Sequence, residues 1–514
     1  MNNPAVAAWT PMPVWVAVPV AAASGALLDA AFPDRGWWWA APVAVTVLFA
    51  CLLGRNFATG ALVGAVSGGT FWLLHVEWLT LYLGPLPWIA LSALETSLFA
   101  LGAGAISVVL NRGAAHWPTP AGRFGLIPVV VAGLWTAREG LAAVWPYGGF
   151  AWGRLSISQV DGGFADLLPW LGAAGVSFVM AWLAAFSVQV LRYRPVMSWV
   201  PATAIAAVSL TLVALPGWPA GQEGTLRVVA VQGGADAGLF ADNRAGDLLR
   251  AHRAATPGPE VGPVDVVVWP ENSTDVDPLR SADSARVLDE LSEVMGAPLV
   301  VGTITARGDE FFNTSLLWKA GEGATDWYDK AHPVPFAEYM PDRSFWRPFA
   351  PELVDLVTRD YSIGTRENVF ALGEVLAGVS ICFDIADDQL VTEMIKAGAQ
   401  LILAQTNNAD FGRTDESVQQ LAIARMRALE TARSVVNIST VGTSAIVHPD
   451  GSVNDQLSTW MPGSIVADVP LSTTMTPAIV IGRQIEWFVA GLGLSALVLV
   501  VSRPAWRSRR ARPN

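Results

Sequence analysis

The stretch Leu376-Ala-Gly-Val-Ser-Ile-Cys-Phe-Asp384 decides the fold of the second half of this chain. Its first six residues are apolar or small and do not alternate with charged residues, which is typical of a strand buried on both faces of a layered α/β domain. Cys382 follows at the expected end of that strand. A strand that delivers a thiol to a turn presents a nucleophile, although a free cysteine is also commonly a buried structural side chain.

Two other strand-like segments end at reactive side chains. Glu271 lies in Val266-Val-Val-Trp-Pro-Glu-Asn272, and Lys330 lies in Trp327-Tyr-Asp-Lys-Ala-His332. Either residue alone could be an ordinary turn or surface charge. Because loops at strand ends form the sites of layered α/β domains, we expect the carboxylate, the ammonium and the Cys382 thiol to meet. This combination predicts an acyl-transfer site.

The composition divides the chain of 514 residues into a membrane part and a soluble part. Its hydrophobic fraction is 52%, its charged fraction is 15% and its net charge is −12. Apolar residues dominate 10–215 and 478–501, whereas 222–475 has the composition of a soluble domain. We therefore expect an α-helical membrane bundle combined with an α/β domain. No basic stripe favours nucleic acid, and the five histidines show no metal-ligand spacing.

Eight apolar stretches are long enough to cross a bilayer, which takes roughly 20 residues. They are 12–32, 37–54, 57–79, 84–110, 124–145, 165–191, 198–216 and 478–501. The predicted domains are a seven-helix bundle over 1–216, an extracytoplasmic domain over 217–477, an eighth transmembrane helix over 478–502 and a basic cytoplasmic tail over 503–514. Arginines are more frequent in the loops that this arrangement places inside, so we expect a multi-pass plasma-membrane protein with both termini in the cytoplasm.

Two charged residues, Arg138 and Glu139, fall within the fifth of these apolar stretches. Charges inside a bilayer are costly, so they either pair with each other inside the bundle or contact a lipid headgroup near the outer face.

The segment 331–370 shows little periodicity and combines five prolines with several aromatic side chains, among them Phe336, Tyr339 and Trp346. So many aromatic residues are unusual in the loop of a soluble domain. Beside a membrane the segment could be a lid that meets acyl chains. Alternatively, it packs onto its own domain.

Four motifs resemble the nitrilase (carbon-nitrogen hydrolase) superfamily: WPEN at 269–272, YDKAHPVPFAEYMP at 328–341, ICFD at 381–384 and QTNNADFG at 405–412. That superfamily carries a Glu–Lys–Cys triad in an αββα sandwich. With its predicted spans, PFAEYMP at 335–341 and ARMRALETAR at 424–433, the chain resembles one membrane-embedded branch, the apolipoprotein N-acyltransferases. The resemblance implies transfer of a fatty acyl chain from a phospholipid to the N-terminal α-amine of diacylglyceryl-cysteine in bacterial apolipoproteins, the last step of lipoprotein maturation.

The resemblance also implies roles for individual residues. Cys382 would form a thioester in a ping-pong reaction, Glu271 would be the general base, and Lys330 would bind the oxyanion. Further positions are the backbone N–H of Phe383 as a second oxyanion donor, Glu338 and Tyr339 in support or in the lid, and Asn407, Phe336 and Trp346 as substrate contacts. The expected partners are a phospholipid and a modified lipoprotein. Neither cofactor nor metal is expected, and the protein is expected to be a monomer.

Two positions depart from the family pattern. Asp384 stands where the family often has Glu, and Asp410 stands where an aromatic residue is common. Two other functions also remain open. One is a membrane-tethered amidase or nitrile hydrolase that sends water to the thioester, against which the eight predicted spans argue. The other is a non-catalytic membrane scaffold with a nitrilase-like head, against which the intact triad argues.

Overall fold

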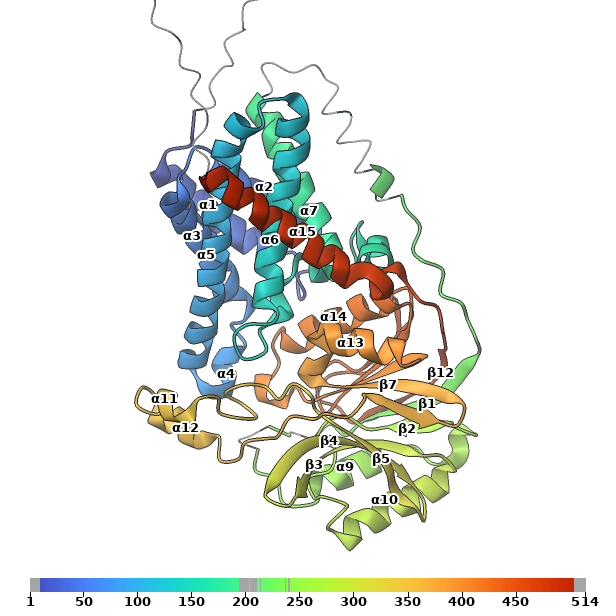
Figure 1. The fold of residues 1–514 in the computed structure, drawn as a ribbon. Helices are drawn as coiled ribbons and strands as arrows, with labels where there is room; N and C mark the ends of the chain where they lie inside the picture. The colour runs from blue at the N-terminus through green and yellow to red at the C-terminus, as the bar shows by residue number, and fades with distance from the viewer. Residues whose placement is uncertain are drawn as a thin grey trace, which may run out of the picture.

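The protein consists of a helical bundle and an α/β domain stacked on one another (Figure 1). The computed structural model describes residues 10–193, 203, 210–212, 214–235, 237–238 and 241–502. The α/β domain follows the first seven bundle helices in sequence, and the chain then returns to the bundle through a last helix.

Apolar helices form the bundle because their sequences are hydrophobic all round rather than on one stripe. They are α1 (Val14–Asp29), α2 (Ala40–Leu52), α3 (Phe57–His75), α4 (Leu79–Leu83), α5 (Pro85–His116), α6 (Ile127–Ala142), α7 (Leu168–Tyr193) and α15 (Pro477–Ser502). Small residues let the helices approach closely. A Cβ on Gly133 of α6 would lie 2.3 Å from the carbonyl oxygen of Val489 in α15.

Five helical segments within the described residues are long and apolar enough to cross a membrane, namely 57–75, 85–116, 122–142, 165–193 and 477–502. The predicted stretches 12–32 and 37–54 form the shorter apolar helices α1 and α2. Most of the predicted stretch 198–216 and the whole tail 503–514 lie outside the described residues. Several apolar helices that could span a membrane are therefore present, and the number of eight stays a prediction.

Two six-stranded sheets form the α/β domain, with strand orders β12-β1-β2-β3-β4-β5 and β11-β10-β9-β8-β7-β6. The first sheet contains β1 (Thr225–Gln232), β2 (Val266–Val268), β3 (Leu299–Arg307), β4 (Glu310–Lys319), β5 (Gly323–Asp329) and β12 (Gly463–Pro470). The second contains β6 (Val369–Leu372), β7 (Val375–Ile381), β8 (Leu401–Thr406), β9 (Ser434–Ser439), β10 (Ala445–Val447) and β11 (Val453–Gln456). Apolar residues of both sheets pack into one core between them.

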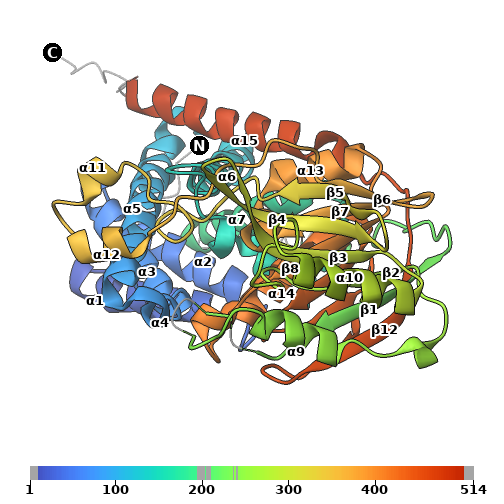
Figure 2. The same ribbon diagram turned by 90° about the horizontal axis from the view of Figure 1, so that it is seen from below.

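Helices cover the outer face of each sheet and complete the four layers (Figures 1 and 2). Helices α9 (Asp247–Ala255) and α10 (Ala282–Met295) lie against the first sheet. Helices α13 (Asp388–Lys396) and α14 (Glu416–Thr431) cover the second sheet and lie between it and the bundle. The second sheet therefore carries the layer that meets the membrane part.

The elements that the sequence analysis missed are mostly edge strands. Strands β12, β5, β11 and β6 are the four ends of the two sheets. Of these, only β5 was predicted, as the strand-like segment that ends before Lys330. An edge strand has a weaker apolar signal because part of it faces solvent, and most residues of β5 and β11 are only partly buried or exposed. The segment 331–370 contains two short helices, α11 (Arg343–Trp346) and α12 (Pro351–Leu356).

Candidate active site

Three turns after strands carry the predicted reactive residues. Cys382 follows β7 directly and opens a 3₁₀ turn over Cys382–Ala386. Its φ of 50° is a left-handed conformation that non-glycine residues rarely adopt, and such outliers gather at functional sites. Lys330 follows β5 directly, and Glu271 lies three residues beyond β2. The strand-end placement predicted for all three residues is confirmed.

The ammonium of Lys330 lies between two carboxylates. Its Nζ is 3.2 Å from Oε1 of Glu271 and 2.8 Å from Oε2 of Glu338. Nδ2 of Asn313 donates to both of these acids, at 2.7 Å each. The backbone N–H of Val334 donates to Oε2 of Glu338 at 2.6 Å. Glu338 is therefore part of a buried polar cluster with Lys330 and not an ordinary solvated loop acid.

Burial and charge set the protonation of this cluster. Burial alone would lower the pKa of Lys330, but the carboxylates of Glu271 and Glu338 raise it well above its ordinary value, so the lysine stays an ammonium. Burial raises the pKa of Glu271, the charge of Lys330 lowers it, and the net shift is upward. An acid with a raised pKa beside a fixed cation is suited to accept and return a proton.

Burial and the charges of Glu271, Lys330 and Glu338 shift the pKa of the Cys382 thiol. Burial raises its pKa well above the ordinary value, Glu271 raises it further, and Lys330 acts in the opposite direction. The sulfur also lies 3.5 Å from Nε2 of Gln420 on α14. Burial and the nearby acids therefore favour the thiol form of Cys382, and a base would be needed for its sulfur to act as a nucleophile.

Asp384, a departure from the family pattern, braces the site. Its Oδ2 accepts from the hydroxyl of Tyr328 at 2.9 Å, and its Oδ1 accepts from the backbone N–H of His332 at 3.0 Å. These bonds tie the turn that carries Cys382 to the chain on both sides of Lys330. The shorter side chain of Asp thus bridges two of the three site segments.

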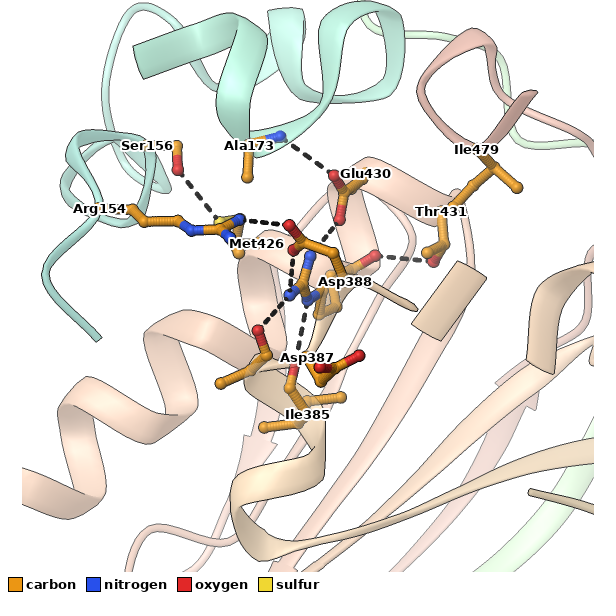
Figure 3. Close-up of polar contacts among 12 residues, drawn as sticks. Arg154, Ser156, Ala173, Ile385, Asp387, Asp388, Met426, Glu430, Thr431 and Ile479 are labelled. Atoms are coloured by element: carbon orange, nitrogen blue, oxygen red, sulfur yellow. Dashed lines mark hydrogen bonds and ion pairs between the residues drawn. The ribbon is translucent and has the colours of Figure 1, made fainter. Parts of the chain in front are cut away.

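A second buried network fixes the far end of the same turn (Figure 3). Arg427 of α14 donates to the carbonyls of Ile385 and Ala386, at 2.9 and 2.8 Å. Asp388 accepts from Arg427 at 2.8 Å and from Arg154 of the bundle at 2.6 Å. Burial alone would raise the pKa of Asp388, but the two guanidinium groups hold it well below its usual value. Asp388 therefore links Arg154 of the bundle to Arg427, which holds the turn after Cys382.

The bundle also contacts Phe383, the residue that follows Cys382. The ring of Phe383 stacks on Phe150 and Trp152, with centroid distances of 6.0 and 6.2 Å and planes within 12° of parallel. Both partners lie between α6 and α7. The reactive turn thus faces the membrane part of the protein.

The predicted lid and substrate residues lie in two places. Phe336 packs edge-on against Trp346 at a centroid distance of 5.5 Å, and the backbone N–H of Phe336 donates to the carbonyl of Tyr339. Figures 1 and 2 both place their segment, with α11 and α12, at the end of the bundle near α4 and α5. Asn407 donates to the carbonyl of Ala237, in the segment that follows β1, at 3.2 Å. Substrate contacts of Phe336, Trp346 and Asn407 stay predictions.

Sequence reasoning missed three residues at the site: Asn313, Gly302 and Gln420. Asn313 lies inside β4, where a polar residue gives no pattern signal. A Cβ on Gly302 would lie 2.4 Å from the carbonyl oxygen of Pro270 and 2.7 Å from Cα of Glu271. A glycine within a strand pattern does signal such a close backbone approach, so this residue could have been found.

Arg138 and Glu139 pair with each other inside the bundle. Nη2 of Arg138 lies 3.4 Å from Oε1 of Glu139, and both side chains are buried. The Arg138 guanidinium also lies over the rings of Phe99 and Trp135, 4.8 and 4.6 Å from their centroids. Of the two interpretations, the structure supports a pair within the bundle. In the described residues, no group of three or more His, Cys, Asp or Glu side chains could hold a metal ion.

Comparison with known proteins first defines the class. Residues 228–476 match the carbon-nitrogen hydrolase family, and residues 24–186 match the apolipoprotein N-acyltransferase N-terminal domain. An apolipoprotein N-acyltransferase of Mycolicibacterium smegmatis is 31% identical, over 93% of this chain and 84% of that protein. Proteins of the same name are 24% identical in Photobacterium profundum, over 96% of this chain and 97% of that protein, and 28% identical in Azotobacter vinelandii, over 98% of each. The chain belongs to the apolipoprotein N-acyltransferase family.

Proposed function

We propose that this protein transfers a fatty acyl chain from a membrane phospholipid to the N-terminal α-amine of diacylglyceryl-cysteine in apolipoproteins. The observation that carries the proposal is the buried cluster of Glu271, Lys330 and Glu338 beside the Cys382 thiol, on a turn that faces the bundle. Family membership supports the same activity.

The first half-reaction loads the enzyme. Glu271 removes the proton from Cys382, and the sulfur attacks the ester carbonyl of the phospholipid. Lys330 and the backbone N–H of Phe383 donate to the oxyanion that forms, and the loss of one such donor typically costs about 100- to 1,000-fold in rate. The C–O bond then breaks, Glu271 returns the proton to the leaving oxygen, and a lysophospholipid departs. A thioester on Cys382 remains.

The second half-reaction transfers the chain. Glu271 takes a proton from the α-amine of the lipoprotein, and the nitrogen attacks the thioester carbonyl. The same donors bind the second oxyanion. Collapse breaks the C–S bond, so an amide leaves and Cys382 is restored by the proton held on Glu271. The two substrates bind in turn, which is a ping-pong reaction. Neither step requires a cofactor or a metal.

The surroundings of the site favour a lipid over a small soluble substrate. Phe383 stacks on bundle residues, and the loop at 331–370 exposes Phe345 and Phe349, which are 57% and 71% accessible. Exposed aromatic side chains beside apolar helices suit acyl chains better than water. An amidase that uses water needs no such surface, and a scaffold needs no buried cluster of a lysine with two acids.

A membrane arrangement follows from this function. We propose eight transmembrane helices, a catalytic domain over 217–477 on the extracytoplasmic side and both termini in the cytoplasm, with a monomer as the functional unit. The arginine distribution among the loops supports this orientation. The apolar helices described above support the membrane association.

Mass spectrometry of the full-length protein incubated with phospholipid vesicles tests the proposal. The peptide that contains Cys382 should gain the mass of one fatty acyl chain, and an N-terminal diacylglyceryl-cysteine peptide should remove it as an amide. Cys382→Ala should lose both signals, whereas Cys51→Ala, which changes the other cysteine, should keep them. Rapid loss of the adduct to water without an amine would favour the hydrolase. Unchanged lipoprotein N-acylation by Cys382→Ala would refute the proposal.

A further inference from the structure

The sulfur of Cys382 has a polar neighbour outside the cluster of Glu271, Lys330 and Glu338. Nε2 of Gln420 lies 3.5 Å from Sγ, and the Gln420 side chain is buried on α14. We propose that Gln420 is a catalytic residue that donates an N–H to the Cys382 sulfur whenever that sulfur carries negative charge. This inference rests on the proposed role of Cys382 as the nucleophile.

The orientation of the Gln420 amide decides whether nitrogen or oxygen faces the sulfur. Oε1 of Gln420 accepts from Nδ2 of Asn408 at 2.7 Å. The Asn408 amide is oriented in turn by hydroxyl groups of Thr406 and Ser439, which both donate to its Oδ1. Because Oδ1 of Asn408 is occupied, its Nδ2 turns to Gln420, and the nitrogen of Gln420 turns to the sulfur.

The neighbouring residue holds this turn of α14 in place. Oε1 of Gln419 accepts from the indole N–H groups of Trp152 and Trp78, at 2.8 and 3.0 Å. Its Nε2 donates to the carbonyl of His75 at 3.1 Å. All three partners belong to the bundle side of the protein. Gln419 thus fixes the helix to the bundle at the position where Gln420 meets the nucleophile.

The charges around the sulfur explain why a neutral donor is useful here. Glu271 and Glu338 oppose a thiolate electrostatically, and Lys330 favours it. A hydrogen bond to the charged form of a group favours that form. An amide provides this bond without adding a positive charge that would lower the proton affinity of Glu271.

The donor would act at two moments. When the S–H bond breaks and the proton moves to Glu271, the lone pair of sulfur attacks the acyl carbon while Gln420 donates to the sulfur. When the amine later displaces the sulfur, the C–S bond breaks and Gln420 donates to the departing thiolate. No atom of Gln420 is transferred in either step.

The pH dependence of Cys382 alkylation by iodoacetamide tests the inference in the full-length protein with Cys51→Ala. Gln420→Leu should move the alkylation profile upward by about one pH unit and slow acylation about tenfold, as expected for one hydrogen bond to a charged group. Gln420→His keeps a donor and should restore part of the shift. Ser417→Ala, which changes a residue one turn earlier whose hydroxyl contacts that of Thr443 at 3.1 Å, should leave the profile unchanged.

An unchanged profile and acylation rate in Gln420→Leu would overturn the inference. Should that variant not fold, Gln420→Glu replaces it: the added carboxylate must shift the profile further upward than Gln420→His does, and equal profiles would also overturn the inference. The proposed function fails separately, because it would be refuted by acylation activity in Cys382→Ala, whatever the profile of the Gln420 variants.

Discussion

Replacing Arg427 by methionine tests whether one buried guanidinium holds the turn that carries Cys382. Arg427 is 1% exposed, and it donates to the carbonyls of Ile385 and Ala386 and to the carboxylates of Asp388 and Glu430. Methionine keeps much of the apolar stem of arginine and removes all of these hydrogen bonds. The variant therefore isolates the polar contribution to the turn.

The expected loss of stability depends on which hydrogen bonds Asp388 and Glu430 keep when Arg427 is removed. Removing one member of a buried ion pair costs about 3–5 kcal/mol when the other charge is left alone. Here Asp388 keeps Arg154 at 2.6 Å, and Glu430 keeps the backbone N–H of Ala173 at 3.0 Å. We therefore expect the lower end, about 3 kcal/mol. At roughly 2–4 °C per kcal/mol for a domain of this size, Tm should fall by about 6–12 °C.

Thermal unfolding of the purified full-length protein in detergent measures the loss, and the rate of Cys382 alkylation reports the turn itself. Arg425→Met is the matched control, because Arg425 lies on the same helix and pairs with the exposed Asp161. A surface pair contributes only about 0–1 kcal/mol. Equal melting temperatures and alkylation rates in the Arg427 and Arg425 variants would refute the reasoning.

Three further changes test other parts of the structure. Gly302→Ala should reduce the rate of acyl-enzyme formation on the order of 100-fold, because the new Cβ would lie 2.7 Å from Cα of Glu271. Mass spectrometry of the Cys382 adduct measures this rate, and an unchanged circular dichroism spectrum shows that the variant is folded. The pKa of Glu416 is raised to about 8, mainly by burial. Between the ordinary pKa of a glutamate and pH 8, the folded chain therefore keeps a proton on Glu416 that the unfolded chain has already released. Stability should therefore fall as pH rises toward 8, and Tm values from pH 5 to 8 should fall less in Glu416→Gln. Phe345→Ser with Phe349→Ser should raise KM for vesicle phospholipid more than it lowers kcat, and an unchanged KM would argue against a lid that meets lipid.

Much of the architecture could be predicted from the sequence. Runs of apolar residues without alternation identified the inner strand before Cys382, because burial on both faces leaves a direct trace in composition. They also identified the sharp contrast between the membrane and soluble parts. The edge strand β11 could not be predicted in the same way, since it is held by backbone pairing with β10 rather than by apolar side chains. Its hydrogen bonds leave no residue pattern.

The residues of the candidate site also differ in how readily the sequence reveals them. Strand-end residues with reactive groups, such as Lys330 and Cys382, stand out because their chemistry is rare on the chain. Asn313 and Gln420 do not stand out, because amides occur everywhere and their importance lies in which atoms they meet after folding. Asp384 appeared in the sequence only as a departure from a pattern, and its two hydrogen bonds explain it as a brace.

Helix α14 joins the two halves of the protein through its periodicity. Positions seven apart lie within about 20° of each other around an α-helix, as do positions eleven apart, because each residue turns the helix by about 100°. Gln420 and Arg427 are seven apart, and they meet the two ends of the turn that carries Cys382. Gln419 and Glu430 are eleven apart, and both bond to the bundle. A single rigid helix therefore presents one polar row to the turn that carries Cys382 and another to the membrane part. A shift of the bundle against the domain would then move the groups that contact the Cys382 sulfur.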